Sequence, residues 1–245
     1  MNAWGRWHRV KRATGCCFEH PVRPESRYPN TGCAEPHPVA RLVSSRDILT
    51  LMDRREPIRK TMKRREVPGG VRFVTFSCEQ RLPLFLNPAI RAVFEAALHA
   101  AHIRFRFELF AWVVMPEHVH LLLRPPKGIK LDRILTFIKT SVMRRVLPRW
   151  KELKAPILKR LVRPDGTHRF WQKGGGFDRN VRDEYAFTKE VRYTHRNPVE
   201  RGLVSNAEDW RSSSVRWWMG RRDGELPCDP PPGDPRAWAS WRGYV

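Results

Sequence analysis

The order of apolar patterns along the chain predicts an α+β fold, with helices packed on one face of a sheet. Three observations predict it: short apolar runs typical of strands, two longer segments with helical periodicity, and the mixing of the two kinds along the chain. Strands mixed with crossover helices form layers around one core. A chain of 245 residues is long enough for one such domain with appendages.

The expected elements begin near residue 71. Strands are expected where β-branched and aromatic residues gather in short runs, and helices where apolar residues recur every three or four positions. In chain order the pattern predicts a strand at 71–78, a helix at 88–101, strands at 103–115 and 118–124, a helix at 131–147, short strands near 168–171 and 177–182, and a helix from about 183. Pro198 and Gly202 are expected to end the last helix.

Two histidines stand on the predicted strand 118–124. Because side chains alternate along a strand, His118 and His120 share one face while Val119 points the other way. Two imidazoles on one face can bind one metal ion, but histidines satisfied by hydrogen bonds inside a core are common. The same alternation places Glu117 on the opposite face from His118 and argues against it as a ligand.

A second pair of polar residues lies on the last predicted helix. Tyr193 and Asn197 are four residues apart, so they share one helix face. A phenol can attack a phosphodiester, and an amide oxygen can bind a hard metal ion. Alternatively, Tyr193 packs in the core and Asn197 closes the helix. Of the four tyrosines only Tyr185 competes as a nucleophile, and its i+4 neighbour is Lys189, not an amide.

With these motifs in this order, the sequence resembles the single-tyrosine HUH transposases, and most closely their branch of REP-associated tyrosine transposases. The resemblance covers about residues 67–218. It rests on six blocks in one order, at residues 73–76, 115–120, 170–172, 177–182, 193–199 and 210–214.

The resemblance implies a ferredoxin-like or RRM-like antiparallel sheet and a nuclease that cuts and rejoins single-stranded DNA at hairpins or palindromic repeats. Carried over residue by residue, it implies Tyr193 as the nucleophile that forms a 5′-phosphotyrosine intermediate. It also implies His118, His120 and Asn197 as ligands of a divalent metal, for which Mg²⁺ or Mn²⁺ suits an open phosphate site. It leaves open whether the protein is a homodimer. Thr194 departs from the family pattern, which leads us to expect an aliphatic residue there.

The charge of the chain indicates a polyanion-binding protein. It has 47 Lys and Arg against 25 Asp and Glu, a formal net charge of +22. Residues 124–163 hold 13 of the basic residues against only two acidic ones, and on the predicted helix 131–147 the basic side chains lie opposite or beside the apolar stripe. The candidate DNA-binding residues are Arg133, Lys139, Arg144, Arg145, Arg179 and, as a ring that stacks on an unpaired base, Trp171. For Trp171, core packing is the alternative.

The expected domain organisation follows from composition and from the extent of the family resemblance. We expect a basic, poorly ordered arm at residues 1–66, a catalytic domain at 67–218, and a tail rich in Pro and Trp at 219–245. No apolar stretch is long enough to span a membrane, and the N-terminus lacks the apolar run of a signal peptide. The prediction is a cytoplasmic protein, associated with the nucleoid through DNA, with no membrane partner.

Two other functions remain compatible with these residues. One is a non-catalytic protein that binds DNA hairpins and derives from such a transposase. The other is a metal-dependent nuclease that hydrolyses DNA without a covalent intermediate. The presence of both histidines together with Tyr193 and Asn197 favours the covalent enzyme.

Overall fold

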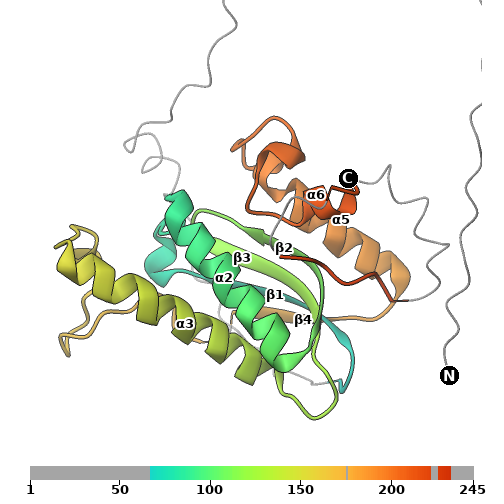
Figure 1. Ribbon diagram of the computed structural model, residues 1–245, viewed down its shortest axis with the longest axis horizontal. Helices are drawn as coiled ribbons and strands as arrows, with labels where there is room; N and C mark the ends of the chain where they lie inside the picture. Colours follow the sequence, from blue (N-terminus) through green and yellow to red (C-terminus); the bar gives the residue numbers. More distant parts are fainter. Residues whose placement is uncertain (1–66, 175, 222–225, 233–245) are drawn as a thin grey trace, which may run out of the picture. The chain divides into compact units, whose positions relative to one another are not determined.

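A four-stranded antiparallel sheet in the order β2-β3-β1-β4 organises the domain (Figure 1). The computed structural model describes residues 67–174, 176–221 and 226–232. Its strands are β1 (Val71–Ser77), β2 (Glu108–Val114), β3 (His118–Arg124) and β4 (Phe177–Val181). The predicted fold class is confirmed. The arm predicted at 1–66 lies outside the described residues, as do residues 222–225 and 233–245 of the predicted tail.

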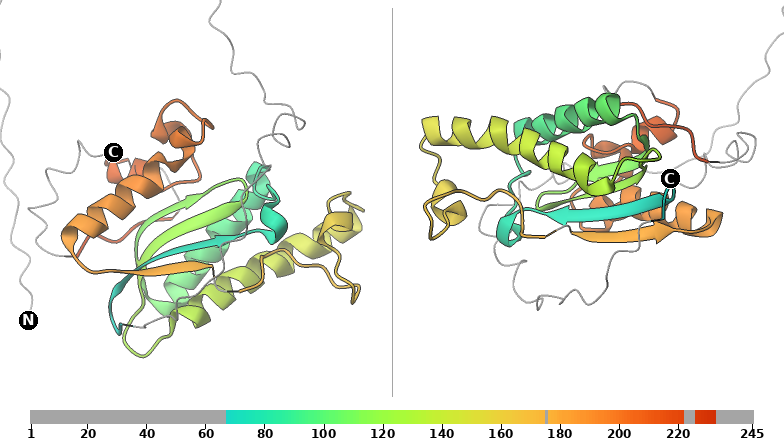
Figure 2. Two further views of the ribbon diagram at one scale, coloured as in Figure 1. Left: turned by 180° about the vertical axis from the view of Figure 1, so that it is seen from behind. Right: turned by 90° about the horizontal axis from the view of Figure 1, so that it is seen from below.

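The helices cover both faces of this sheet. They are η1 (Glu79–Arg81), α2 (Pro88–Phe105), α3 (Leu131–Glu152), α4 (Leu158–Leu161), α5 (Glu184–Glu200), η2 (Ala207–Asp209) and α6 (Val215–Trp218). α2 and α3 lie side by side on one face, whereas α5 lies on the other, as the view from behind shows (Figure 2). No helix in the described ranges has the length and apolarity that crossing a membrane requires.

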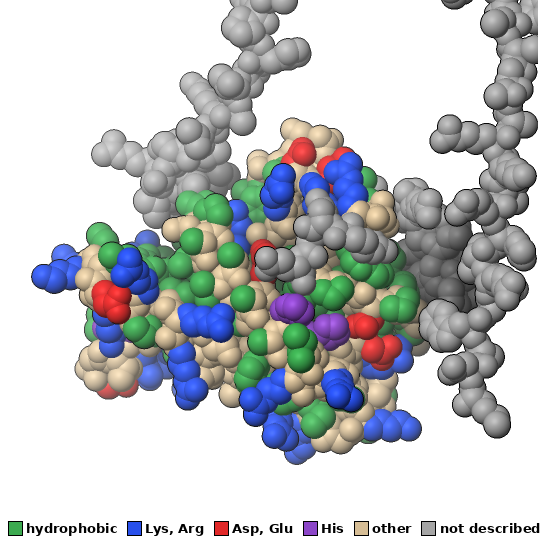
Figure 3. Space-filling view, in the orientation of Figure 1, with side chains coloured by type: hydrophobic (Ala, Val, Ile, Leu, Met, Phe, Trp, Pro, Cys, Tyr) green, Lys and Arg blue, Asp and Glu red, His purple; other side chains and the backbone are tan. Residues whose placement is uncertain are grey.

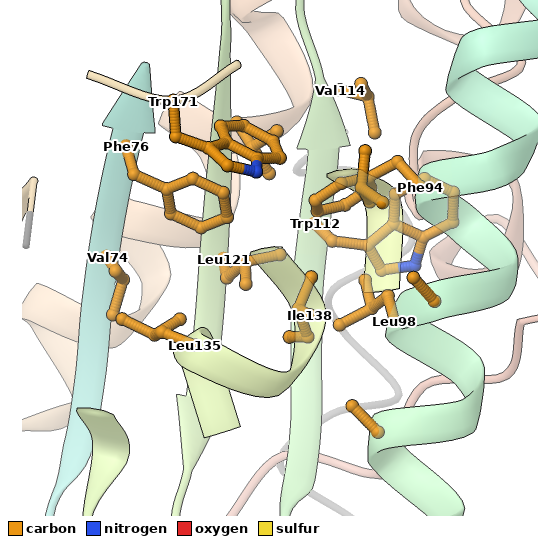
Figure 4. Packing of buried hydrophobic residues seen from close by; sticks show 14 of the residues in the cluster. Val74, Phe76, Phe94, Leu98, Trp112, Val114, Leu121, Leu135, Ile138 and Trp171 are labelled. Atoms are coloured by element: carbon orange, nitrogen blue, oxygen red, sulfur yellow. The ribbon is translucent and has the colours of Figure 1, made fainter. Parts of the chain in front are cut away.

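The larger core fills the space between the sheet and the pair α2 and α3 (Figure 4). Alternate strand residues point into it, and they meet one apolar stripe from each helix. All six apolar positions predicted for α3 are buried, namely Leu131, Ile134, Leu135, Ile138, Val142 and Val146. The predicted face of this helix is therefore confirmed.

A smaller core lies under α5 on the opposite face of the sheet. Phe73 of β1 and Leu122 of β3 pack there against Phe187 and Val191 of α5. The prediction placed helices on one face only, and α5 adds a cover to the second. β3 accordingly reads as a continuous apolar run after the histidines, as expected of a strand buried on both sides.

Some element boundaries differ from the predicted ones. α2 continues to Phe105 and ends at Arg106, which has a left-handed backbone, so β2 starts at Glu108 and not at residue 103. α3 continues through Pro148 to Glu152, and Trp150 in this last part stacks on Phe170. The strand expected at 168–171 is reduced to isolated bridges.

The block at residues 210–214 covers the outer edge of β2. Ser214 donates its backbone N–H to the carbonyl of Trp112, and Val114 donates to the carbonyl of Ser212. The indole N–H of Trp210 donates to the carbonyl of Val114. This block, which is one of those that carry the family resemblance, therefore has a structural role, because it covers the otherwise unpaired edge of β2.

Candidate active site

β3 and α5 bring the two polar motifs into contact across the face that α5 covers. The side-chain nitrogen Nδ2 of Asn197 lies 3.3 Å from Nε2 of His120, although 77 residues separate the two in sequence. Nε2 of His118 lies 2.9 Å from Nε2 of His120. The two imidazoles and the amide therefore converge on one point.

The orientation of both imidazoles is fixed by hydrogen bonds on their Nδ1 sides. Nδ1 of His118 lies 3.0 Å from a carboxylate oxygen of Glu117, and Nδ1 of His120 lies 2.7 Å from the hydroxyl of Thr75. A bond from Nδ1–H to a carboxylate leaves the Nε2 lone pair of His118 free. Burial and the neighbouring His118 hold the pKa of His120 well below its usual value. A neutral imidazole is the form that binds a metal.

Asn197 fits the role of the third ligand. It is buried, and its side-chain oxygen has no hydrogen-bond partner in the described part of the chain. A buried amide oxygen without a partner is costly unless something else satisfies it, as a cation does. No group of three or more His, Cys, Asp or Glu among the described residues is arranged to hold a metal ion, so the amide is needed here to complete a three-ligand set. Two imidazole nitrogens and an amide oxygen suit a divalent ion.

Tyr193 lies next to this cluster, on its solvent-exposed side. Its ring centroid is 5.2 Å from that of His120 and 5.9 Å from that of Phe73. The side chain is 42% exposed, so an incoming DNA strand can reach the phenol. Tyr185, the competing tyrosine, is 79% exposed and lies eight residues earlier, near the start of α5. His195 points elsewhere: it is fully buried, bonds to the hydroxyl of Ser214, and has a pKa lowered to about 3 by burial.

Glu117 is the functional candidate that the sequence analysis missed. It lies one residue before β3, so strand alternation does not govern it, and its carboxylate turns toward His118. Arg201 donates to it at 2.8 Å, and Arg81 lies at 3.5 Å. Burial opposes its ionisation, but the hydrogen bond from His118 and the charge and hydrogen bond of Arg201 outweigh it and lower the pKa to about 2. Glu117 is thus an ionised orienting group that also links β3 to the end of α5.

Arg179 lies on the same face as the cluster, on the edge strand β4. It forms an ion pair with Glu190 of α5, and its guanidinium lies 5.9 Å from the ring of Phe73. Since Phe73 stacks on His120 at 5.4 Å, Arg179 borders the site. Of the predicted DNA-binding residues, Arg179 is the one that the structure brings to the histidines.

The remaining predicted DNA contacts lie elsewhere. Arg133, Lys139, Arg144 and Arg145 belong to α3, which packs on the sheet face opposite to His118 and His120. These four basic residues are therefore separated from the histidines by the sheet, and DNA binding by α3 stays a prediction. Figure 3 shows Lys and Arg side chains spread over the side of the molecule that carries α2 and α3.

Trp171 is a core residue in this structure. It is 5% exposed, it packs against Phe76 and Phe94, and its indole N–H donates to the carbonyl of Lys139. A ring enclosed in this way cannot stack on a base. The alternative reading, core packing, is the right one.

Comparison with known proteins finds similar transposases. The family described as "Transposase IS200 like" matches residues 71–174, which include both histidines and end before β4 and α5. A REP-associated tyrosine transposase of Escherichia coli (strain K12) is 29% identical over 167 residues, 68% of this chain and 88% of the relative. A relative from Haemophilus influenzae that carries the same family name is 26% identical over 147 residues, 60% of this chain and 80% of its own. The chain is therefore similar to IS200-like transposases, and in particular to REP-associated ones.

These similarities confirm the resemblance found in the sequence, and they support a DNA-processing enzyme. A solved structure described as a REP-associated tyrosine transposase bound to a REP hairpin has the same fold, with a TM-score of 0.52 at 21% identity. The match covers 72% of this chain and 94% of that one.

Proposed function

We propose that this transposase cuts and rejoins single-stranded DNA through a 5′-phosphotyrosine on Tyr193, at a site next to a DNA hairpin. The observation that carries the proposal is the convergence of His118 and His120 of β3 with Asn197 and Tyr193 of α5. The hairpin bound to the structurally similar transposase supports hairpin DNA as the substrate.

In the cutting step, the phenol oxygen of Tyr193 attacks the scissile phosphorus. A bond forms between this oxygen and phosphorus, and the bond to the 3′ oxygen of the preceding nucleotide breaks. The phenol loses its proton and the leaving oxygen gains one, which frees a 3′ hydroxyl. Rejoining reverses the step: a 3′ hydroxyl attacks the phosphotyrosine and releases the phenol.

His118, His120 and Asn197 would hold a divalent ion beside that phosphate, with Mg²⁺ or Mn²⁺ as the proposed ions. The chemistry that such an ion would supply is polarisation of the phosphate and compensation of the charge that develops on it. Glu117 keeps His118 in the tautomer that presents Nε2. The partial exposure of Tyr193 lets the phenol meet the DNA without a movement of α5.

The test is a search for a covalent adduct. Purified full-length protein, its Tyr193→Phe variant and its Tyr185→Phe variant are incubated with end-labelled hairpin oligonucleotides that carry single-stranded flanks, with Mn²⁺. We expect a protein–DNA adduct on a denaturing gel for the wild type and for Tyr185→Phe, and none for Tyr193→Phe.

The other outcomes identify the alternatives. Binding of hairpins without cleavage across a broad panel of sequences would indicate a non-catalytic hairpin-binding protein. Cleavage that persists in Tyr193→Phe, with no protein-linked product, would indicate a nuclease that hydrolyses DNA directly.

A further inference from the structure

An exposed aromatic ring lies next to the proposed active site, on strand β4. Phe177 is 48% exposed, which is unusual for so large an apolar side chain. It faces Thr75 across the β1–β4 pair, and Thr75 faces His120 across the β1–β3 pair. Directly paired residues share a sheet face, so Phe177, Thr75 and His120 form one row across the sheet.

The ring of Phe177 continues a series of rings that starts at the site. It meets Phe73 edge-on at 6.5 Å, and Phe73 stacks on His120 and meets Tyr193 edge-on. Yet Phe177 belongs to neither buried core of the described domain. Part of its surface is therefore left to water beside the nucleophile.

A charged group accompanies this ring. The guanidinium of Arg179, two residues further along β4, lies 6.0 Å from the ring of Phe177 and is about half exposed. The buried carboxylate of Glu190 holds it in place from α5. An aromatic surface beside a fixed guanidinium is the combination that binds unpaired nucleotides, since the ring stacks on the base and the cation pairs with the phosphate.

We propose that Phe177 and Arg179 form a subsite for one unpaired nucleotide that adjoins the scissile phosphate, with Phe177 stacked on its base. This proposal rests on the proposed function, because it needs single-stranded DNA at Tyr193. Stacking accepts every base, so the subsite requires that a base is present and discriminates little among the four. It positions the phosphate for attack and adds little sequence specificity.

The test removes the base and the ring separately. The parent is the full chain with Tyr193→Phe, which binds without cutting, and the probes are hairpin oligonucleotides with an abasic site placed at one flanking position at a time. With Phe177 present, we expect one abasic position next to the scissile phosphate to weaken binding about 5- to 150-fold, the loss that corresponds to a base stacked on a protein ring. With Phe177→Ala added, an abasic site at that position should no longer weaken binding, while abasic sites further along the strand should weaken it as much as before.

Two further variants control for indirect effects. Phe177→Trp should restore the sensitivity to the abasic site, because it restores a stacking ring on the same backbone. Tyr185→Ala, which removes an exposed ring elsewhere on the domain, should leave the sensitivity unchanged.

The outcomes separate the two proposals. Equal abasic effects with and without the Phe177 ring would overturn the subsite while leaving the covalent chemistry of Tyr193 intact. A change of oligomeric state in Phe177→Ala, with unchanged abasic effects, would mean that the ring contacts a second copy of the chain instead of DNA. Failure of the parent to bind any hairpin would instead contradict the proposed function.

Discussion

Thr194 is buried in α5, and its hydroxyl has no hydrogen-bond partner within the described part of the chain. An unsatisfied buried hydroxyl costs about 1–3 kcal/mol, and valine has nearly the same shape without it. We expect Thr194→Val to raise the free energy of unfolding by about 1 kcal/mol or more, measured from the urea midpoint at constant m-value. Thr188→Val in the same helix is the control, because the Thr188 hydroxyl donates to the carbonyl of Glu184 and its loss should not stabilise. Equal effects of the two substitutions would contradict this account.

Glu117 should control how tightly the site binds metal. Loss of an orienting carboxylate typically weakens metal affinity about 10- to 100-fold. In Glu117→Gln the side chain can still accept from His118 but no longer pairs with Arg201, whereas Glu117→Ala loses both contacts. We expect the Mn²⁺ affinity, measured by calorimetric titration, to be highest in the wild type, lower in Glu117→Gln and lowest in Glu117→Ala.

Glu200→Ala provides the control for that series. Glu200 lies at the end of α5, is half exposed and pairs with Arg196 at the surface, so its removal should leave Mn²⁺ affinity unchanged. If Glu117→Ala behaves like Glu200→Ala, packing alone orients His118.

At the residue scale, the sequence predicted the groups that its motifs contain and missed those that depend on the fold. His118, His120, Tyr193 and Asn197 follow from spacing on a strand and a helix together with the family resemblance, and the structure brings these four together. Glu117 was missed because strand alternation was applied one residue before the strand begins.

Gly176 fixes the start of β4 and hence the place of Phe177. A Cβ added there would lie 2.0 Å from the carbonyl oxygen of Thr75, and its φ of +77° disfavours a side chain. Gly176→Ala must therefore push β4 away from β1, and we expect a loss of about 1–3 kcal/mol in unfolding free energy beyond the backbone strain itself. The glycine at position 176 is therefore required by its close approach to β1.

Gly174→Ala is the matched control for this change. Gly174 also has a positive φ, of +95°, but no atom lies within 4 Å of a Cβ added there. It should show the cost of backbone strain alone in the same urea titration. If both variants lose the same stability, contact with Thr75 is not what demands a glycine at position 176.

At the element scale, periodicity predicted which side of a helix is apolar but not which sheet face the helix covers. The apolar stripe of α3 was predicted correctly, but the structure was needed to show that α3 packs on the sheet face opposite to the histidines. The helix ends shifted for local reasons. Arg106 supplies a left-handed end to α2, and the packing of Trp150 accompanies the extension of α3 beyond Pro148.

At the scale of the whole molecule, a net charge of +22 should make DNA binding strongly dependent on salt. On single strands, each neutralised phosphate adds about −0.7 to the slope of log K against log salt concentration. Replacing Arg179 and Glu190 together by Gln removes the cation without leaving a buried carboxylate unpaired. We therefore expect the slope to become shallower by about 0.7, the value for one phosphate contact on a single strand.

Glu190→Gln alone keeps the cation and should keep the slope, as measured by fluorescence anisotropy over a series of salt concentrations. An unchanged slope in the double variant would remove Arg179 from the DNA surface. Arg144→Gln in the same series tests the prediction that α3 binds DNA.

The order in which the site's parts occur along the chain bears on how the protein is made. The histidines are synthesised first, the edge strand β4 must then pair with β1 across 106 residues, and α5 brings Tyr193 and Asn197 last. Contacts between such distant segments form late, because the intervening chain must first be brought into place. A chain that stops before α5 therefore carries two of the proposed metal ligands but no nucleophile from this helix. Under the proposed mechanism, unfinished products of translation would thus lack the group that attacks DNA.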